Sequence, residues 1–307
     1  MDAKGKKVYV GLSGGVDSAV SAALLKEQGA RVTGVFIKGW YPPGMPCTWA
    51  ADRRDAMRVA ARLQIPFVTL DASVEYKKYV IDYLLAEYAA GRTPNPDIMC
   101  NKEVKFGAFY RYAITEGAEY IATGHYLAGE KDQRYFLWAV PHEVVEKTLF
   151  PVGEMDKSHV RRLAKRYNLP VAEKKDSQGV CFLGAVSVKE FLQKELGTDN
   201  PALLYTIGQR VRGAYVVAKD VVKRELTLST DRTPTARVVA FAHRNWHRDP
   251  AGAVWAECRY RGPKSAGRVD GERFIATEWL RETPVPGQSI VFYNAGDELV
   301  GGGIIEG

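Results

Sequence analysis

The sequence predicts an α/β domain built on a parallel sheet, followed by a small antiparallel β-barrel or sandwich. In the first half, short β-branched runs such as 31–38 alternate with amphipathic helical patterns such as 16–28. Strands that alternate with helices imply a parallel sheet covered on both faces. In the last third, alternating apolar and polar runs such as 288–294 are broken by Gly, Pro and Asp, which is typical of antiparallel strands.

The individual elements follow from the same two patterns. Strands of the parallel sheet are expected at 6–12, 31–38, 66–72 and 119–126, and helices at 16–28, 50–64, 74–91 and 102–115. The stretch 141–197 is mostly helical, most clearly at 156–170, and antiparallel strands are expected at 213–220, 224–230, 236–242, 253–261 and 288–294. We expect three domains: a catalytic domain at 1–192, a reduced central β domain at 193–233 and a β-barrel at 234–307.

The composition indicates a globular protein with a modest excess of positive charge. The 307 residues are 46% hydrophobic and 26% charged, with a net charge of +7. The first residues do not form a signal peptide, and no stretch approaches the roughly 20 apolar residues of a membrane span. We therefore expect a cytoplasmic protein without membrane attachment. The excess of Lys and Arg is compatible with a polyanionic partner.

The four cysteines are Cys47, Cys100, Cys181 and Cys258, and none belongs to a CxxC pair. A structural zinc site is therefore not expected, and a permanent disulfide is not expected in a cytoplasmic chain. For Cys47 and Cys258 the simplest interpretation is a small buried apolar residue.

A glycine-rich segment, Ser13-Gly14-Gly15-Val16-Asp17-Ser18, connects the first predicted strand to the first helix. Such a turn aims backbone N–H groups and the helix dipole at an anion, and glycine lets the backbone approach a phosphate. Asp17 is well placed to hold a Mg²⁺ ion that bridges phosphates. A Walker A loop needs G-K-[ST], which is absent. A Rossmann site needs an acid after the second strand, which ends Phe36-Ile37-Lys38.

Cys100 follows the segment Pro94-Asn95-Pro96-Asp97, which is expected to be an extended, stiff loop before a helix that begins at about Asn101. A thiol at a helix N-terminus near Lys102 and Lys105 is expected to have a depressed pKa. Asp97 is a candidate general acid or base.

Cys181 lies in the polar, glycine-containing segment 174–182, with two lysines upstream. A thiol in such a loop can carry a persulfide and exchange with another cysteine. The 81 positions between Cys100 and Cys181 leave their pairing open at this point.

These segments together resemble a known family. The glycine-rich segment is similar to the SGGxDS loop of the PP-loop ATP pyrophosphatases, which cleave ATP to AMP and pyrophosphate. From residue 7 nearly to the C-terminus, the sequence resembles the tRNA-specific 2-thiouridylases. The matching segments are GLSGGVDSAVSA, AEYAAGRTPNPDIMCNKEVKF, YIATGHY, KDQRYFL, LFPVGE, KKDSQGVCFLG, YTIGQR, TPVPGQSIVFYN and GGGIIE. The resemblance implies a PP-loop (adenine nucleotide alpha hydrolase-like) catalytic domain with a C-terminal antiparallel β-barrel.

The resemblance also implies an activity. The family uses ATP to adenylate the C2 carbonyl oxygen of the wobble uridine in certain tRNAs and replaces this oxygen with sulfur. Cys181 would accept a persulfide sulfur from a donor protein, and Cys100 would resolve it, either by releasing sulfide or by closing a transient disulfide. Asp97 would transfer protons. The free enzyme is expected to be a monomer.

The resemblance assigns further residues to the two substrates. The ATP site would be lined by Gly11, Leu12, Ser13, Gly14, Gly15, Val16, Asp17, Ser18, Ile37 and Gly124. Contacts to tRNA would come from Asn95, Pro96, Asp97, His125, Lys131, Asp132, Gln133, Arg259, Tyr260 and Gln288.

Four features depart from the family pattern. Position 37 is Ile where Met is usual, and the loop between Tyr126 and Lys131 is short. The segment between Phe191 and Tyr205 lacks most of a glycine-rich β excursion, and the strand region after Arg210 is compressed. The alternatives to a thiouridylase are another PP-loop enzyme, such as an amidating synthetase or a different tRNA-modifying enzyme, and a nucleic-acid-binding module with a vestigial nucleotide site. A synthetase needs no cysteine pair, and a binding module releases no pyrophosphate.

Overall fold

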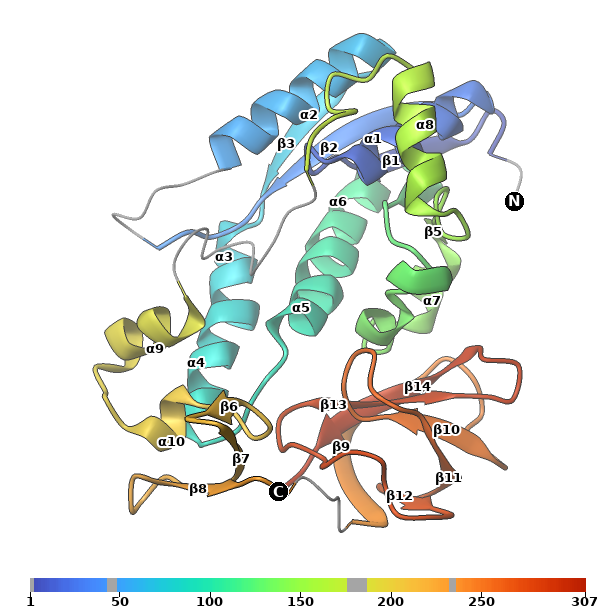
Figure 1. The fold of residues 1–307 in the computed structure, drawn as a ribbon. Coiled ribbons are helices and arrows are strands. Elements are labelled where there is room, and N and C mark those ends of the chain that lie inside the picture. The colour runs from blue at the N-terminus through green and yellow to red at the C-terminus, as the bar shows by residue number, and fades with distance from the viewer. Residues whose placement is uncertain (1–2, 43–48, 176–186, 232–235) are drawn as a thin grey trace. The chain divides into compact units, whose positions relative to one another are not determined.

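The computed structural model describes residues 3–42, 49–175, 187–231 and 236–307 (Figure 1). The chain divides into two compact units, each assembled from separate stretches of sequence. Unit 1 consists of Met1–Lys78, Cys100–Arg134 and Val140–Ala185, and unit 2 consists of Tyr79–Met99, Tyr135–Ala139 and Val186–Gly307.

Unit 1 contains a parallel sheet of five strands in the order β3-β2-β1-β4-β5. The predicted parallel sheet is therefore confirmed. The fifth strand was not predicted and lies in a stretch expected to be mostly helical. A strand of two residues is too short to show a periodicity. The strands are β1 (Lys7–Gly11), β2 (Arg31–Lys38), β3 (Phe67–Asp71), β4 (Tyr120–Ala122) and β5 (Thr148–Leu149).

Helices cover both faces of this sheet (Figure 1). Alternate residues of β1 show why: Val8 and Val10 join the buried core with α1, whereas the Tyr9 ring packs at 6.2 Å against Tyr112 of α6. The helices of the first face are α1 (Val16–Glu27), α2 (Trp49–Leu63) and α8 (Lys157–Arg166), and α6 (Phe109–Thr115) lies on the second; shorter elements of unit 1 are α3 (Ser73–Tyr76), η3 (Gly129–Lys131) and α7 (His142–Glu146).

The helix around Cys100 begins earlier than predicted. Helical turns follow one another from Pro96 through α5 (Pro96–Met99), the π-helical segment η2 (Cys100–Ala108) and α6. The expected start at about Asn101 is therefore wrong. The Asn95 side chain accepts a hydrogen bond from the Asp97 N–H at 3.1 Å, and Pro96 takes the first helical position, where its missing N–H costs nothing. Asn-Pro here starts a helix instead of extending a loop.

Unit 2 contains a closed antiparallel barrel, as the sequence predicts, in the order β10-β11-β12-β9-β14-β13. Its core includes Phe241, Phe274 and Phe292, which the alternating pattern points inward. The strands are β9 (Val238–Trp246), β10 (Val254–Glu257), β11 (Ser265–Asp270), β12 (Arg273–Ala276), β13 (Ser289–Tyr293) and β14 (Leu299–Ile305).

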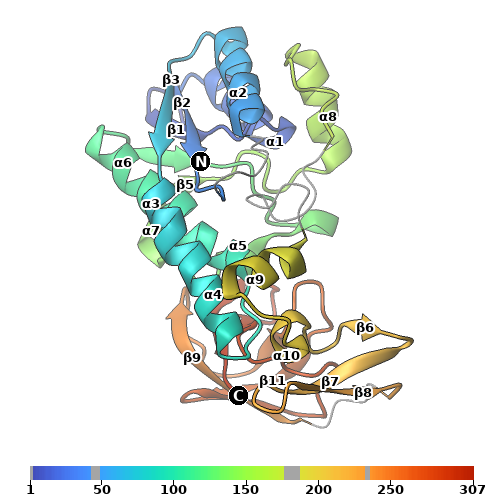
Figure 2. The same ribbon diagram turned by 90° about the vertical axis from the view of Figure 1, so that its left-hand side faces the viewer.

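A smaller sheet and several helices complete unit 2 (Figure 2). The sheet has the order β6-β7-β8. Ser187 and Glu190 form a capping box at the start of α9, and α4 packs against α9 and α10. These elements are β6 (Arg210–Val211), β7 (Ala214–Asp220), β8 (Glu225–Ser229), η1 (Lys77–Ile81, shared with unit 1), α4 (Asp82–Ala89), η4 (Arg134–Leu137, shared with unit 1), α9 (Val188–Leu196) and α10 (Pro201–Leu204). None of the helices in the described ranges combines the length and apolar character needed to cross a membrane.

The segment Tyr135–Ala139 is packed against the barrel. The indole N–H of Trp138 donates to the Ser289 hydroxyl at 2.9 Å, and the Tyr135 hydroxyl donates to the Ser289 carbonyl at 3.0 Å. All three residues are buried. The hydroxyl of Ser289 therefore satisfies a polar group that has no access to water.

We predict that Ser289→Ala lowers the free energy of unfolding by about 1–3 kcal/mol, because it leaves the Trp138 N–H buried without its acceptor. Chemical denaturation followed by tryptophan fluorescence measures the change. Ser289→Thr, which keeps the hydroxyl, is the matched comparison. Equal stability of the Ala variant and the wild type would contradict the prediction.

Candidate functional site

The glycine-rich loop lies where β1 ends and α1 begins. The Leu12 N–H donates to the Val35 carbonyl at 2.8 Å, so the loop leaves the sheet from a hydrogen-bonded position. The Ser13 N–H donates to the Ser18 hydroxyl at 3.2 Å, which ties the two ends of the loop together. Val16 is 4% exposed and belongs to the core, so only its backbone is available to a ligand. The loop is a preformed turn at a helix N-terminus.

Two glycines permit the close contacts around this loop. Gly14 has φ +78°, and a Cβ there would lie 2.3 Å from the Asp52 carbonyl oxygen. Gly124 follows β4, and a Cβ there would lie 2.7 Å from the Ser18 backbone nitrogen. Real Cβ atoms do not approach so closely, so larger residues would displace the loop. The structure thus brings Gly124 to Asp17 and Ser18, which lie far from it in the sequence.

This arrangement fits an anionic nucleotide. The neighbours of β1 are β2 on one side and β4 on the other, so the direction of strand order reverses there, and such switch points are where open α/β sheets bind ligands. Ile37 is half-buried near the end of β2, two residues beyond Val35, the partner of Gly11. The residues predicted for the ATP site therefore gather at the carboxyl ends of β1, β2 and β4.

Asp17 has partners that the sequence did not indicate. The Lys157 ammonium lies 2.6 and 2.8 Å from the two carboxylate oxygens, and the Tyr126 hydroxyl donates to Asp17 Oδ1 at 2.6 Å. In the sequence, Lys157 lies near the start of a predicted helix and has no other distinguishing feature. A positively charged side chain is unusual at that place, because the N-terminal end of the helix dipole is itself positive.

The donor set permits one Mg²⁺ ligand at this site. Asp17 supplies a carboxylate within the glycine-rich loop, which is called the phosphate loop below. Mg²⁺ is commonly held by one or two carboxylates together with substrate phosphates. Within the described ranges, no group of three or more His, Cys, Asp or Glu side chains forms a metal site by itself. Asp17 fits a metal that arrives with a nucleotide.

Cys100 is 6% exposed and begins the segment η2. Because the helix starts at Pro96, Cys100 lies beyond the first turn, where the helix dipole has little effect. The expectation that Cys100 lies at a helix N-terminus is therefore wrong. Lys102 and Lys105 follow Cys100 on η2.

Cys181 lies outside the residues that the structure describes. On its N-terminal side, the described chain is fixed by Lys174, whose ammonium lies 2.8 Å from carboxylate oxygens of both Asp52 and Asp55 on α2. Burial opposes the charge of Lys174, but its bonds to Asp52 and Asp55 outweigh burial and raise its pKa. These ion pairs join the stretch before Cys181 to α2, the helix whose Asp52 carbonyl approaches Gly14.

His125 packs between aromatic rings at the end of β4. Its ring centroid lies 5.4 Å from that of Phe106 and 6.5 Å from that of Phe150, and its Nδ1 is 2.9 Å from the Thr123 hydroxyl. Burial lowers the pKa of His125 to about 3, with a contribution from the charge of Lys105. The imidazole is therefore neutral at physiological pH, and it offers a hydrogen bond without a positive charge.

The segment Lys131–Gln133, predicted to contact tRNA, is half-buried and hydrogen-bonded within unit 1. The Gln133 side chain accepts from the Tyr126 N–H at 3.0 Å, and the Gln133 N–H donates to the Tyr126 carbonyl at 2.9 Å. Asp132 accepts from the Arg134 guanidinium at 2.6 and 2.8 Å. These bonds hold Tyr126, whose hydroxyl reaches Asp17.

Unit 2 brings together predicted tRNA contacts that lie far apart in the sequence. The Gln288 amide donates to the Thr93 carbonyl at 2.7 Å, and the Thr93 N–H donates to the Pro286 carbonyl at 2.8 Å. These two bonds dock the stretch that leads to Asn95, Pro96 and Asp97 on the barrel. Asp97 is exposed, and Asn95, Pro96 and Gln288 are half-buried.

Tyr260 belongs to the same part of unit 2. Its ring lies 4.5 Å from Phe136 and 5.8 Å from Tyr135, in a cluster that also contains Ile98. The Arg261 guanidinium lies 5.1 Å from the centre of the Tyr260 ring. An aromatic ring held in this way is a surface on which an unstacked base can pack.

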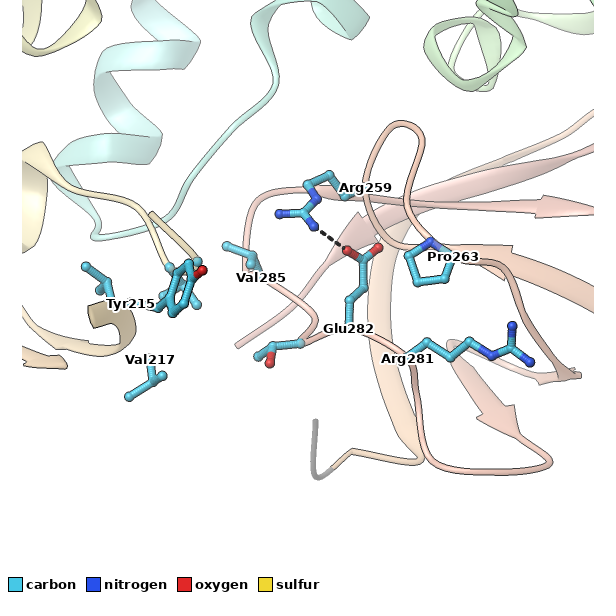
Figure 3. Close-up of a pocket in the computed structure, with 11 residues that line it drawn as sticks. Tyr215, Val217, Arg259, Pro263, Arg281, Glu282 and Val285 are labelled. Carbon is cyan, nitrogen blue, oxygen red and sulfur yellow. Dashed lines mark ion pairs between the residues drawn. The ribbon is translucent and has the colours of Figure 1, made fainter. Parts of the chain in front are cut away.

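Arg259 lines a pocket between β7 and the barrel, both in unit 2 (Figure 3). Its guanidinium lies 2.9 Å from the Glu282 carboxylate, and the Arg259 side chain is 54% exposed whereas that of Glu282 is 11% exposed. A mostly buried carboxylate is thus paired with an arginine side chain that is about half exposed. The lining also includes Tyr215, Val217, Pro263, Arg281 and Val285.

Cys258 differs from Cys100 in its surroundings. It is 5% exposed in the barrel core, and burial, together with Glu282 and Glu257, raises the pKa of its thiol to about 12. The prediction that Cys258 is a buried apolar residue is confirmed, whereas Cys47 lies outside the described residues. A thiol with the pKa of Cys258 is protonated at neutral pH and is a poor nucleophile.

We predict that His125 makes wild-type stability more sensitive to acid than that of His125→Asn. The folded pKa of about 3 lies below the unfolded value near 6.5, so the unfolded state binds the extra proton between these pH values. The stability contributed by neutral His125 is complete above pH 6.5 and is lost as the pH falls toward 3. Urea denaturation of both proteins at several pH values measures the difference. A difference that does not change with pH would contradict the prediction.

Comparison with known proteins identifies the family. A family model described as "tRNA methyl transferase HUP domain" matches residues 6–185. The tRNA-specific 2-thiouridylase MnmA of Streptococcus thermophilus is 40% identical and covers 98% of this chain and 95% of the relative. That of Christiangramia forsetii is 51% identical over 62% of this chain and 54% of the relative. Among solved structures, NMN synthetase from Francisella tularensis has 19% identity and a TM-score of 0.40, over 64% of this chain and 79% of that one. On the sequence identities, the chain belongs to the tRNA-specific 2-thiouridylase family.

Proposed function

We propose that this protein is a tRNA sulfurtransferase that replaces the C2 oxygen of the wobble uridine with sulfur, using ATP to activate the carbonyl. The observation that carries the proposal is the helical segment that connects Cys100 to the phosphate loop. A Cβ on Gly11 would meet the Phe109 ring at 3.5 Å, and Phe106 packs on His125. The part of this helix that lies in unit 1 therefore contacts the ends of both β1 and β4, and Cys100 is the first residue of that part.

The phosphate loop supports the activation step. Its backbone N–H groups and the N-terminus of α1 attract negative charge, and Asp17 is available to a Mg²⁺ ion that accompanies the nucleotide. ATP supplies the adenylyl group that makes the C2 oxygen a leaving group. Ile37 would provide an apolar contact to the adenine, and Gly11 and Gly124 would leave room for the nucleotide.

Two cysteines would then supply the sulfur. A donor protein transfers a sulfur atom to Cys181 as a persulfide. In one route the terminal sulfur attacks C2 and AMP leaves; the Cys100 thiolate then attacks the Cys181 sulfur, breaks the S–S bond and leaves 2-thiouridine. In the other route Cys100 first releases hydrosulfide, which attacks C2. Either route oxidises the two thiols to a disulfide, which a thiol reductant must reduce before the next turnover.

The remaining assignments concern tRNA. Asn95, Pro96 and exposed Asp97 would lie at the target base, with Asp97 transferring protons. His125, Lys131, Asp132 and Gln133 would contact tRNA from unit 1, and Arg259, Tyr260 and Gln288 from unit 2. We also propose the domain limits 1–192, 193–233 and 234–307, a monomeric free enzyme and a cytoplasmic location.

Thiolation of tRNA tests the proposal. With tRNA, ATP, Mg²⁺ and a persulfide donor, we expect 2-thiouridine in the nucleoside digest, together with pyrophosphate release. Cys100→Ser should lower 2-thiouridine formation by at least about 100-fold while pyrophosphate release continues. Cys258→Ala is the matched control and should retain activity, because its thiol is buried in the barrel.

The outcomes separate the candidate functions. Full activity of both Cys100→Ser and Cys181→Ser would favour another PP-loop enzyme. Binding of tRNA without pyrophosphate release would favour a binding module. Absence of 2-thiouridine with a donor that is active in a control reaction would refute the proposal.

Binding of tRNA has a test of its own. We predict that Arg259→Ala weakens tRNA binding and lowers the slope of log affinity against log salt by about 1, as expected for the loss of one phosphate contact. Arg268→Ala removes an equal charge from the barrel, where Arg268 pairs with Asp270 at 3.2 Å, and should have little effect. Filter binding over a range of salt concentrations measures both. Equal slopes for the wild type and Arg259→Ala would exclude this phosphate contact.

A further inference from the structure

Lys157 of unit 1 was not among the predicted site residues, yet it pairs with one of them. Its ammonium contacts both carboxylate oxygens of Asp17, at 2.6 and 2.8 Å. The Lys157 side chain is 16% exposed and that of Asp17 is 30% exposed. Water therefore screens this pair less than an ion pair on an open surface.

The position of Lys157 in its helix disfavours the interpretation that this lysine only stabilises α8. Lys157 is the first residue of α8, where the helix dipole is positive, and a lysine there is unfavourable without an anion nearby. Asp17 is the second residue of α1, where a carboxylate is favourable. A positive side chain is thus held beside the positive end of a second helix, at the phosphate loop. This combination favours a polyanion.

The same carboxylate cannot serve Lys157 and Mg²⁺ equally well. A cation that binds Asp17 is repelled by the ammonium at 2.6 Å from the same group. When a metal binds Asp17, Lys157 requires another anion, and the phosphates that accompany the metal provide one. The Tyr126 hydroxyl, which donates to Asp17 Oδ1 at 2.6 Å, is neutral and does not oppose the metal.

We propose that Lys157 is a phosphate-binding residue of the ATP site, which exchanges its bond to Asp17 for a bond to the polyphosphate when ATP binds with Mg²⁺. This inference rests on the proposed ATP-dependent activity. It adds a residue to the site, and it gives a role to a lysine that contacts the carboxylate proposed to hold the metal.

Ligand binding measured by calorimetry tests the role of Lys157. Lys157→Met should weaken binding of ATP and of pyrophosphate, both with Mg²⁺, by roughly 10- to 100-fold, the value of a hydrogen bond to a charged group. Binding of AMP, which lacks the two outer phosphates, should be nearly unchanged. Lys165→Met is the matched control, because Lys165 lies on the same helix, is 62% exposed and pairs with Glu173. It should bind all three ligands as the wild type does.

A second comparison distinguishes phosphate binding from a structural ion pair. Without Mg²⁺, Asp17→Asn should bind pyrophosphate at least as tightly as the wild type, because Lys157 is no longer held by a carboxylate. A structural pair predicts instead that Asp17→Asn and Lys157→Met weaken binding equally. The double variant Asp17→Asn/Lys157→Met removes both charges together, so it leaves no unpaired charge and can replace Lys157→Met if that variant is unstable. The double variant should bind pyrophosphate as weakly as Lys157→Met.

Each result decides the inference. Unchanged affinity of folded Lys157→Met, or of the double variant, for pyrophosphate and ATP would overturn it, as would equal losses in the two single variants. Formation of 2-thiouridine by the wild type is measured in parallel. If the wild type forms 2-thiouridine and Lys157→Met binds ATP and pyrophosphate with unchanged affinity, only the role of Lys157 is refuted. If Lys157→Met binds these ligands more weakly and the wild type forms no 2-thiouridine, only the proposed function is refuted.

Discussion

The close approach of Gly124 to Asp17 and Ser18 is the constraint on which the rest of the site depends. β1 and β4 are neighbouring parallel strands, so the loop after β1 and the residues after β4 emerge at the same edge of the sheet. A Cβ at position 124 would lie 2.9 Å from the Asp17 carbonyl carbon and would push α1 away from β4. Without a glycine at position 124, Asp17 and Ser18 could not lie so close to the residues that follow β4.

Hydrogen bonds connect Asp17 of the glycine-rich loop to the segment proposed to contact tRNA. Asp17 is bonded to Lys157 and to Tyr126, and the backbone of Tyr126 is bonded to Gln133 on both its N–H and its carbonyl. A displacement of Lys131–Gln133 would therefore move the tyrosine that bonds to Asp17. This contiguous set of hydrogen bonds links Asp17 to the segment Lys131–Gln133, and its strength is a coupling energy that double variants can measure.

The two cysteines that the structure describes are similarly buried but lie in different surroundings. Cys258 and Cys100 are similarly buried, but Cys258 lies in an apolar barrel core with Glu257 and Glu282 nearby, which disfavours a thiolate. Cys100 begins a π-helical segment that carries two lysines, and π-helical turns recur at functional sites because they alter the direction of side chains. The proposed sulfur chemistry requires Cys100 to become accessible during the reaction, since it is 6% exposed.

The sequence by itself determined the parallel sheet, the antiparallel strands of the last third and the glycine-rich turn after the first strand, because periodicity and glycine spacing are local properties of the chain. Closure of the antiparallel strands into a barrel depends on the pairing of strands that lie far apart in the sequence. The sequence misplaced the helix around Cys100, where Asn95 and Pro96 act as a helix start, and it missed β5, which is too short to show a pattern. Only the tertiary structure decided the partners of Asp17 and the burial that keeps His125 neutral. Lys157 lies 140 positions from Asp17, and a contact at that separation depends on how helices pack on the sheet.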